Sequence, residues 1–152
     1  MYFWNTEALS EDIKNSKLTE NDWKNYYLAG LIFLTLSIYI IALSPKENIS
    51  SVLIEAILMV GIIIFGVSIT FNTHKASDNN VANYISKMTA LSFPLSVKFF
   101  TLSILIGLAM GIAEGAGLSL EFEQAWFIAV LSLSVEVLLF WRLNTHLQNI
   151  NT

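Results

Sequence analysis

The chain has 152 residues, of which 55% are hydrophobic and only 13% are charged, and its net charge is −4. Ordinary soluble domains contain about 25% charged residues, so a soluble fold of this composition would have too little polar surface to stay dispersed. The lack of cysteine excludes disulfides and thiolate metal sites, and the lack of a basic run argues against nucleic acid as a partner. The composition predicts a small integral membrane protein in contact with the lipid bilayer.

The N-terminal segment, residues 1–18, is mostly polar, with apolar residues spaced to suit one side of a short helix. Leu9 and Ile13 are one helical turn apart, and three aromatic residues precede them. Helical spacing with aromatic residues at one end is typical of a segment lying in the plane of the membrane interface. A solvated polar tail is the alternative. We expect such a segment within a single transmembrane domain that comprises residues 1–152.

A helix start precedes the first apolar block. Thr19 is suited to cap the free backbone N–H groups of a helix, and Asp22, three residues later, completes a pattern that resembles a capping box. Trp23 then marks the entry into the membrane, where interfacial aromatic residues are common. The first predicted span covers residues 24–44, and Pro45 ends it.

Three further apolar blocks follow, each close to the roughly 20 residues needed to cross about 30 Å of hydrocarbon. They predict spans over residues 51–71, 93–115 and 125–142. A polar loop at 72–80 comes after the second span. Residues 81–88 then have an amphipathic helical pattern, so this piece either lies on the membrane or extends the third span. Pro94 is expected to kink or reset the helix there.

Short connections make neighbouring spans antiparallel. The predicted fold is therefore an all-α integral membrane protein, an up-down bundle of four transmembrane helices with a short N-terminal amphipathic segment. In this topology one side of the membrane has only Lys46. The other side has Lys14, Lys17, Lys24, Lys75, Lys87 and Arg142. By the positive-inside rule both termini are cytoplasmic. We expect a bacterial inner membrane, because the chain is compact and its start lacks the regions of a signal peptide.

Lys98 and Glu136 are predicted to form an ion pair inside the membrane. Lys98 enters the third span from the cytoplasmic side, and Glu136 shortly precedes Trp141, which marks that interface on the fourth span. Because the two spans are antiparallel neighbours, we expect both charges at a similar depth, where pairing lessens the cost of charge in hydrocarbon. The alternative is that Lys98 snorkels, with its stem in the apolar zone and its amine at the headgroups.

Glu55 and Glu114 form a second candidate set. The predicted topology places both carboxylates in the outer third of the membrane. Two nearby carboxylates favour the retention of one proton or the binding of a cation, so the pair is a candidate ion or proton site. The alternative is that each carboxylate lies separately at the interface and is exposed to water.

A ridge of small residues recurs at every fourth position of the third span. This glycine ridge consists of Ser103, Gly107, Gly111 and Gly115. In a helix these residues share a face with almost no side chain, which lets another helix backbone approach closely inside a membrane. The ridge either packs against another span of the same chain or forms the contact between copies of the chain.

Catalytic constellations are missing from the sequence, which has no Ser/His/Asp cluster, phosphate-cradling glycine loop or H-E-x-x-H pattern. We therefore expect no enzymatic activity and predict no catalytic residue, metal or cofactor. His74 and His146 lie at the cytoplasmic edge without the spacing of paired ligands.

Three hypotheses for function follow from these features. The first is a non-enzymatic module that self-associates as a homo-oligomer and acts as a pore, channel or membrane-perturbing effector. The second is an accessory subunit that binds another membrane protein in a larger complex through the same glycine ridge. The third is a small proton- or cation-coupled transporter that uses Glu55 and Glu114.

Overall fold

The computed structural model describes residues 2–43, 49–77, 80–116 and 124–151. Over these residues the chain forms five helices and no strand. They are α1 (Thr6–Lys14), α2 (Glu20–Leu43), α3 (Ile49–Lys75), α4 (Val81–Gly115) and α5 (Gln124–Asn151). The prediction of an all-α protein is confirmed for this part of the chain.

Three of the described helices are long and apolar enough to cross a membrane. The candidate spans are Val52–Lys75 in α3, Ala82–Ala113 in α4 and Trp126–Asn151 in α5. Large apolar side chains on these helices are exposed, including Ile57 at 72% and Ile112 at 74%. Apolar surface of this extent fits hydrocarbon rather than water. The structure therefore supports a membrane location, as the composition predicts.

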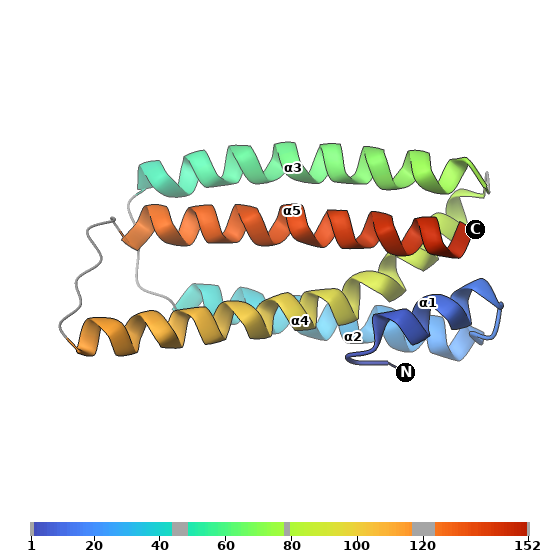
Figure 1. Cartoon of the computed structure of the whole chain (residues 1–152), viewed down its shortest axis with the longest axis horizontal. Helices are drawn as coiled ribbons and strands as arrows, with labels where there is room; N and C mark the ends of the chain where they lie inside the picture. Colours follow the sequence, from blue (N-terminus) through green and yellow to red (C-terminus); the bar gives the residue numbers. More distant parts are fainter. Residues whose placement is uncertain (1, 44–48, 78–79, 117–123, 152) are drawn as a thin grey trace.

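The long helices are arranged as two pairs (Figure 1). α3 and α5 lie side by side and run in the same direction, and α2 and α4 likewise lie side by side and run in the same direction, opposite to that of α3 and α5. α5 also contacts α4, so the order across the molecule is α3, α5, α4, α2. This order differs from the simplest up-down bundle, because α3 packs mainly on α5 rather than on its chain neighbours.

A single glycine sets the close approach of α3 to α5. A Cβ atom added at Gly66 would overlap the ring of Phe140. Nearer the chain termini, Thr73 Oγ1 donates to Asn144 Oδ1 at 2.7 Å, and Asn151 Nδ2 donates to the Thr73 carbonyl at 2.9 Å. Small residues and interhelical hydrogen bonds are the usual means of helix association in membranes. The α3–α5 pair uses both.

The core is concentrated at the end of the molecule where both chain termini lie (Figure 1). Its fully buried side chains come from α1, α2, α4 and α5. They include Leu9, Tyr26, Leu91, Leu143 and Leu147. Toward the other end α4 and α5 diverge (Figure 1), and their apolar side chains are largely exposed. The protein interior is thus built at one end of the helices.

The helix α1 packs against α4 and α5. Leu9 is 0% exposed and Ile13 is 7% exposed, and Asn5 caps the helix by accepting a hydrogen bond from the Ala8 N–H at 3.1 Å. The spacing of Leu9 and Ile13 predicts this amphipathic helix. It does not predict the docking, because the surfaces that cover α1 lie far away in the chain.

The helices α4 and α5 are both longer than the predicted spans. α4 is continuous from Val81 with Pro94 inside it, so residues 81–88 extend the third span rather than form a separate surface helix. α4 changes direction along its length (Figure 1), as expected for a helix whose proline removes a backbone hydrogen bond. α5 continues past Trp141 to Asn151. These extensions provide the surface on which α1 docks.

Candidate functional site

A polar cluster fastens α1 to the longer helices. We call it the α1 cluster. It consists of Thr6 and Ser10 of α1, Lys98 of α4, and Arg142 and His146 of α5. Thr6, Ser10 and His146 are 3%, 6% and 6% exposed, respectively. Buried polar side chains of this kind are retained only when they are hydrogen-bonded, and the contacts of each residue show how this is achieved.

Ser10 and His146 form the buried link between α1 and α5. Ser10 Oγ donates to the Thr6 carbonyl at 2.9 Å and lies 2.9 Å from His146 Nδ1. A hydroxyl has a single proton, and the Thr6 carbonyl accepts it, so the histidine Nδ1–H is the donor in the second bond. This buried bond joins the first helix of the chain to the last.

Lys98 belongs to the same cluster. Its amine donates to Thr6 Oγ1 at 2.8 Å, and its charge interacts with those of Arg142 and Glu7. In the described part of the chain, the salt bridge that is present joins Lys17 to Asp12 at 3.7 Å. The structure therefore does not bring Lys98 and Glu136 together as the predicted ion pair.

The position of Glu136 explains this difference. If Trp141 marks the membrane edge, Glu136 lies little more than one turn inside it. α5 instead continues to Asn151, so the half-buried Glu136 lies near the middle of the helix. The positions on α5 that interact with Lys98 are Arg142 and His146.

The candidate ion or proton site at Glu55 and Glu114 stays a prediction. Glu55 is half-buried near the start of α3. Glu114 belongs to the last turn of α4, but its side chain lies outside the described residues.

The glycine ridge is open in the single chain. Ser103 is half-buried, and its hydroxyl donates to the Phe99 carbonyl at 3.0 Å within the same helix. Gly107, Gly111 and Gly115 are exposed, and a Cβ atom added at any of them would meet nothing within 4 Å. The described side chains therefore leave the ridge uncovered, and the side chains of residues 38–43 of α2 lie outside the described residues. Gly66 on α3, by contrast, packs within the chain.

His74 makes a second buried polar contact, which joins α3 to the residue that precedes α4. It is 1% exposed, and its Nε2 lies 3.1 Å from the Asn80 carbonyl. Nearby, the Thr70 hydroxyl lies 2.9 Å from the hydroxyl of Tyr84. Within the described ranges, no group of three or more His, Cys, Asp or Glu side chains could hold a metal ion. The partners of His74 and His146 are not evident from the sequence, because the fold brings them together from other segments of the chain.

The comparisons with family models, curated proteins and solved structures find no significant match to this chain.

Proposed function

We propose that this protein is a non-enzymatic membrane module with four transmembrane helices, α2 to α5, that associates with copies of itself. α2 has 24 residues and is about 36 Å long at 1.5 Å per residue, enough to cross about 30 Å of hydrocarbon. Its charged residues are confined to the start of the helix, at Glu20, Asp22 and Lys24. Exposed apolar side chains follow them at Leu28, Leu31, Ile32, Leu34 and Leu36. These features support α2 as the fourth span.

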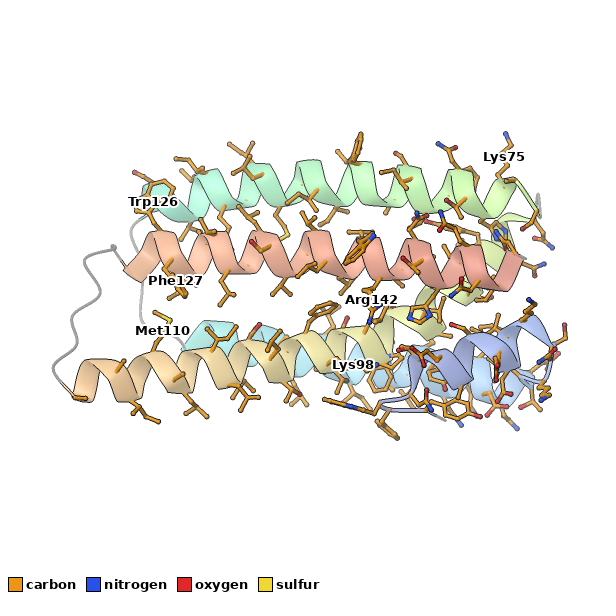
Figure 2. The ribbon with its side chains drawn as sticks, viewed as in Figure 1. Lys75, Lys98, Met110, Trp126, Phe127 and Arg142 are labelled. Atoms are coloured by element: carbon orange, nitrogen blue, oxygen red, sulfur yellow. The ribbon has the colours of Figure 1, made fainter. Side chains whose placement is uncertain are left out.

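The distribution of basic residues supports cytoplasmic termini. Both termini and α1 lie at one end of the molecule (Figure 1), and Lys75 points away from α3 at that same end (Figure 2). Lys14 is the last residue of α1, and Lys17 follows the helix. Lys87 lies in the second turn of α4. Basic residues gather on the cytoplasmic side of membrane proteins. We place this end in the cytoplasm and the protein in a bacterial inner membrane.

The observation that carries the proposal is the open glycine ridge. Gly107, Gly111 and Gly115 lie on an exposed face of an apolar helix, and among the described residues nothing lies within 4 Å of a Cβ atom added at any of them. Such a face lets the backbone of a second helix approach closely, and close packing drives helix association in lipid. We propose that α4 of another copy occupies it. Because the described helices of one copy form two pairs, we place any pore or channel between copies.

The experiment is co-purification of two differently tagged copies after co-expression. Gly111→Leu should abolish the co-purification, because the leucine fills the face on which the second helix packs. Ala109→Leu is the matched control. It adds a leucine to an exposed position of the same helix, but the 100° turn per residue places it on a different face. Equal co-purification of both variants would contradict the proposal. Capture of a different membrane protein in fixed ratio by wild type, but not by Gly111→Leu, would instead favour the accessory subunit.

A further inference from the structure

A polar cavity of about 360 Å³ lies at the end of the molecule where both chain termini lie (Figure 1). We call it the α1–α4 cavity. The end of α1, the turn after it and the first turns of α2 and α4 border it. The polar side chains of its lining are Lys14, Ser16, Asn83, Ser86 and Lys87. Small-molecule sites in proteins measure about 300–1,000 Å³, so this cavity is large enough for a small ligand.

The charge of the α1–α4 cavity is positive. Lys14 of α1 and Lys87 of α4 line it, and the described residues of its lining include no acidic side chain. Lys14 also borders a neighbouring cavity whose lining includes Glu7 and Glu11. Within the described part of the chain, however, neither lysine forms a salt bridge with a carboxylate. Two lysines from different helices that share one cavity without an ion pair favour an anionic ligand.

Ser16 lines the cavity in a backbone conformation that favours glycine. Its φ angle is 53°, in the left-handed region. The Ser16 N–H donates to the Ile13 carbonyl at 3.1 Å, which ends α1. The next N–H, of Lys17, donates to the Asp12 carbonyl at 2.9 Å. This pair of bonds is the Schellman motif, in which the left-handed residue is usually glycine.

The serine therefore adds a hydroxyl that the turn itself does not use. Within the described residues, the Ser16 hydroxyl has no hydrogen-bond partner. An anion on the cavity would accept a hydrogen bond from it. The Ser86 hydroxyl differs, because it donates to the Ala82 carbonyl at 2.9 Å. Ser16 is thus the hydroxyl available to a ligand.

The start of α4 adds to the preference for an anion. α4 begins at Val81, and Asn83 in its first turn lines the cavity. The backbone N–H groups and the positive end of a helix dipole favour negative charge at this position. A phosphate group has enough oxygens to accept hydrogen bonds from both lysines and from a hydroxyl at the same time.

We propose that the α1–α4 cavity binds a phosphate group through the ammonium groups of Lys14 and Lys87 and the hydroxyl of Ser16. A soluble phosphate ester and a phospholipid headgroup present the same chemistry, and the experiments below separate them. A ligand bound to all three residues would hold the end of α1 against the start of α4. The site does not depend on the self-association proposed above.

The first test is calorimetric titration of the intact protein in detergent with inorganic phosphate, at an ionic strength held constant with chloride. We expect saturable binding by wild type. Lys14→Gln/Lys87→Gln should bind phosphate at least about tenfold more weakly, because charge-assisted hydrogen bonds are lost. Lys75→Gln removes an exposed cation at the same end, outside the cavity, and should match wild type. Equal binding by the double variant and wild type would overturn the proposal.

Ser16→Gly separates a ligand site from a strained turn. Glycine adopts the left-handed conformation freely, so the ligand-free variant should unfold at a higher temperature than wild type. The same variant should bind phosphate more weakly, because the donor hydroxyl is lost. Unchanged phosphate binding in this variant would contradict the assignment of Ser16 as a ligand donor.

The source of the phosphate group is tested by native mass spectrometry after addition of phosphatidylglycerol or phosphatidylcholine with matched acyl chains. A preference of wild type for phosphatidylglycerol that Lys14→Gln/Lys87→Gln loses would assign the site to an anionic lipid headgroup. Saturable binding of inorganic phosphate without that lipid preference would assign it to a soluble phosphate ester. The absence of both in wild type would overturn the proposal.

Discussion

The hydroxyl of Ser10 lies 2.9 Å from Nδ1 of His146, although the two residues are 136 positions apart in the chain. This buried contact joins the first helix of the protein to its last. Together with the Lys98–Thr6 bond, it fixes α1 across the end of α4 and α5.

Ser10→Ala should loosen α1. It removes the acceptor of the His146 Nδ1–H, and a buried donor left without a partner costs about 1–3 kcal/mol. Hydrogen exchange of the α1 amides should therefore quicken. Ser68→Ala is the control, because the Ser68 hydroxyl bonds only the Ile64 carbonyl of its own helix. Unchanged exchange in Ser10→Ala would mean that the contact does not hold α1 in place.

Leu9→Ala should weaken the packing of α1 against α4 and α5. Leu9 is 0% exposed, and truncation of a buried leucine costs about 2–5 kcal/mol. Leu53→Ala on α3, where the side chain is 58% exposed, should cost much less. Unfolding in detergent measured by circular dichroism compares the two. Similar losses of stability in the two variants would show that the packing of α1 does not stabilise the protein.

The sequence carries the local features of this fold but not its long-range pairing. Apolar blocks predict the long helices, and the pattern at Thr19 and Asp22 predicts the capping box that the structure contains, with Thr19 Oγ1 donating to Asp22 Oδ2 at 2.6 Å. Which helices pair is not encoded locally, because lipid and a neighbouring helix are equally apolar surroundings. Nothing in the sequence around Gly66 therefore shows that it, rather than Gly111, packs within the chain.

The candidate sites were less predictable for a related reason. Trp141 alone predicts the membrane edge on α5, but Leu143 and Leu147 continue the helix and are buried. Lys98 therefore bonds Thr6 of the α1 cluster rather than Glu136. Apolar residues at helical spacing beyond Trp141 are the feature of the sequence that indicates the longer helix.

The capping box should make the start of α2 sensitive to acid. Hydrogen bonds from the Thr19 hydroxyl and backbone N–H lower the pKa of Asp22. A lowered pKa in the folded state means that the stabilisation is present above the unfolded pKa of about 3.9 and is lost as pH falls through the folded pKa. Exchange of the first-turn amides of α2 should quicken over that acidic range. Asp22→Asn should remove this pH dependence, and an unchanged profile in that variant would contradict the assignment.

Gly66→Ala should disrupt the α3–α5 pair, because the new methyl group overlaps the ring of Phe140. Overpacking of this kind costs about 1–3 kcal/mol. Gly61→Ala is the matched control on the same helix, since a Cβ atom there meets nothing within 4 Å. Thermal unfolding should separate the two variants, and Phe140→Leu should partly restore Gly66→Ala. If the two alanine variants unfold alike, the close contact is not required.

The four-span topology can be tested with single cysteines, because the chain has none of its own. Ser50→Cys lies at the start of α3, and Ser77→Cys lies in the turn after it. In intact cells, a membrane-impermeant maleimide should label only Ser50→Cys. Inverted vesicles should show the opposite pattern. Labelling of Ser77→Cys from outside would reverse the orientation, and labelling of both from one side would contradict a membrane-spanning α3.

The most direct test of self-association is the protein mass of the wild-type complex in nanodiscs, with the mass of the lipid separated from that of the protein. Open glycines on α4 predict a defined assembly of several copies of the 17.0 kDa chain. A single copy, at protein concentrations where Gly111→Leu is also a single copy, would contradict the account.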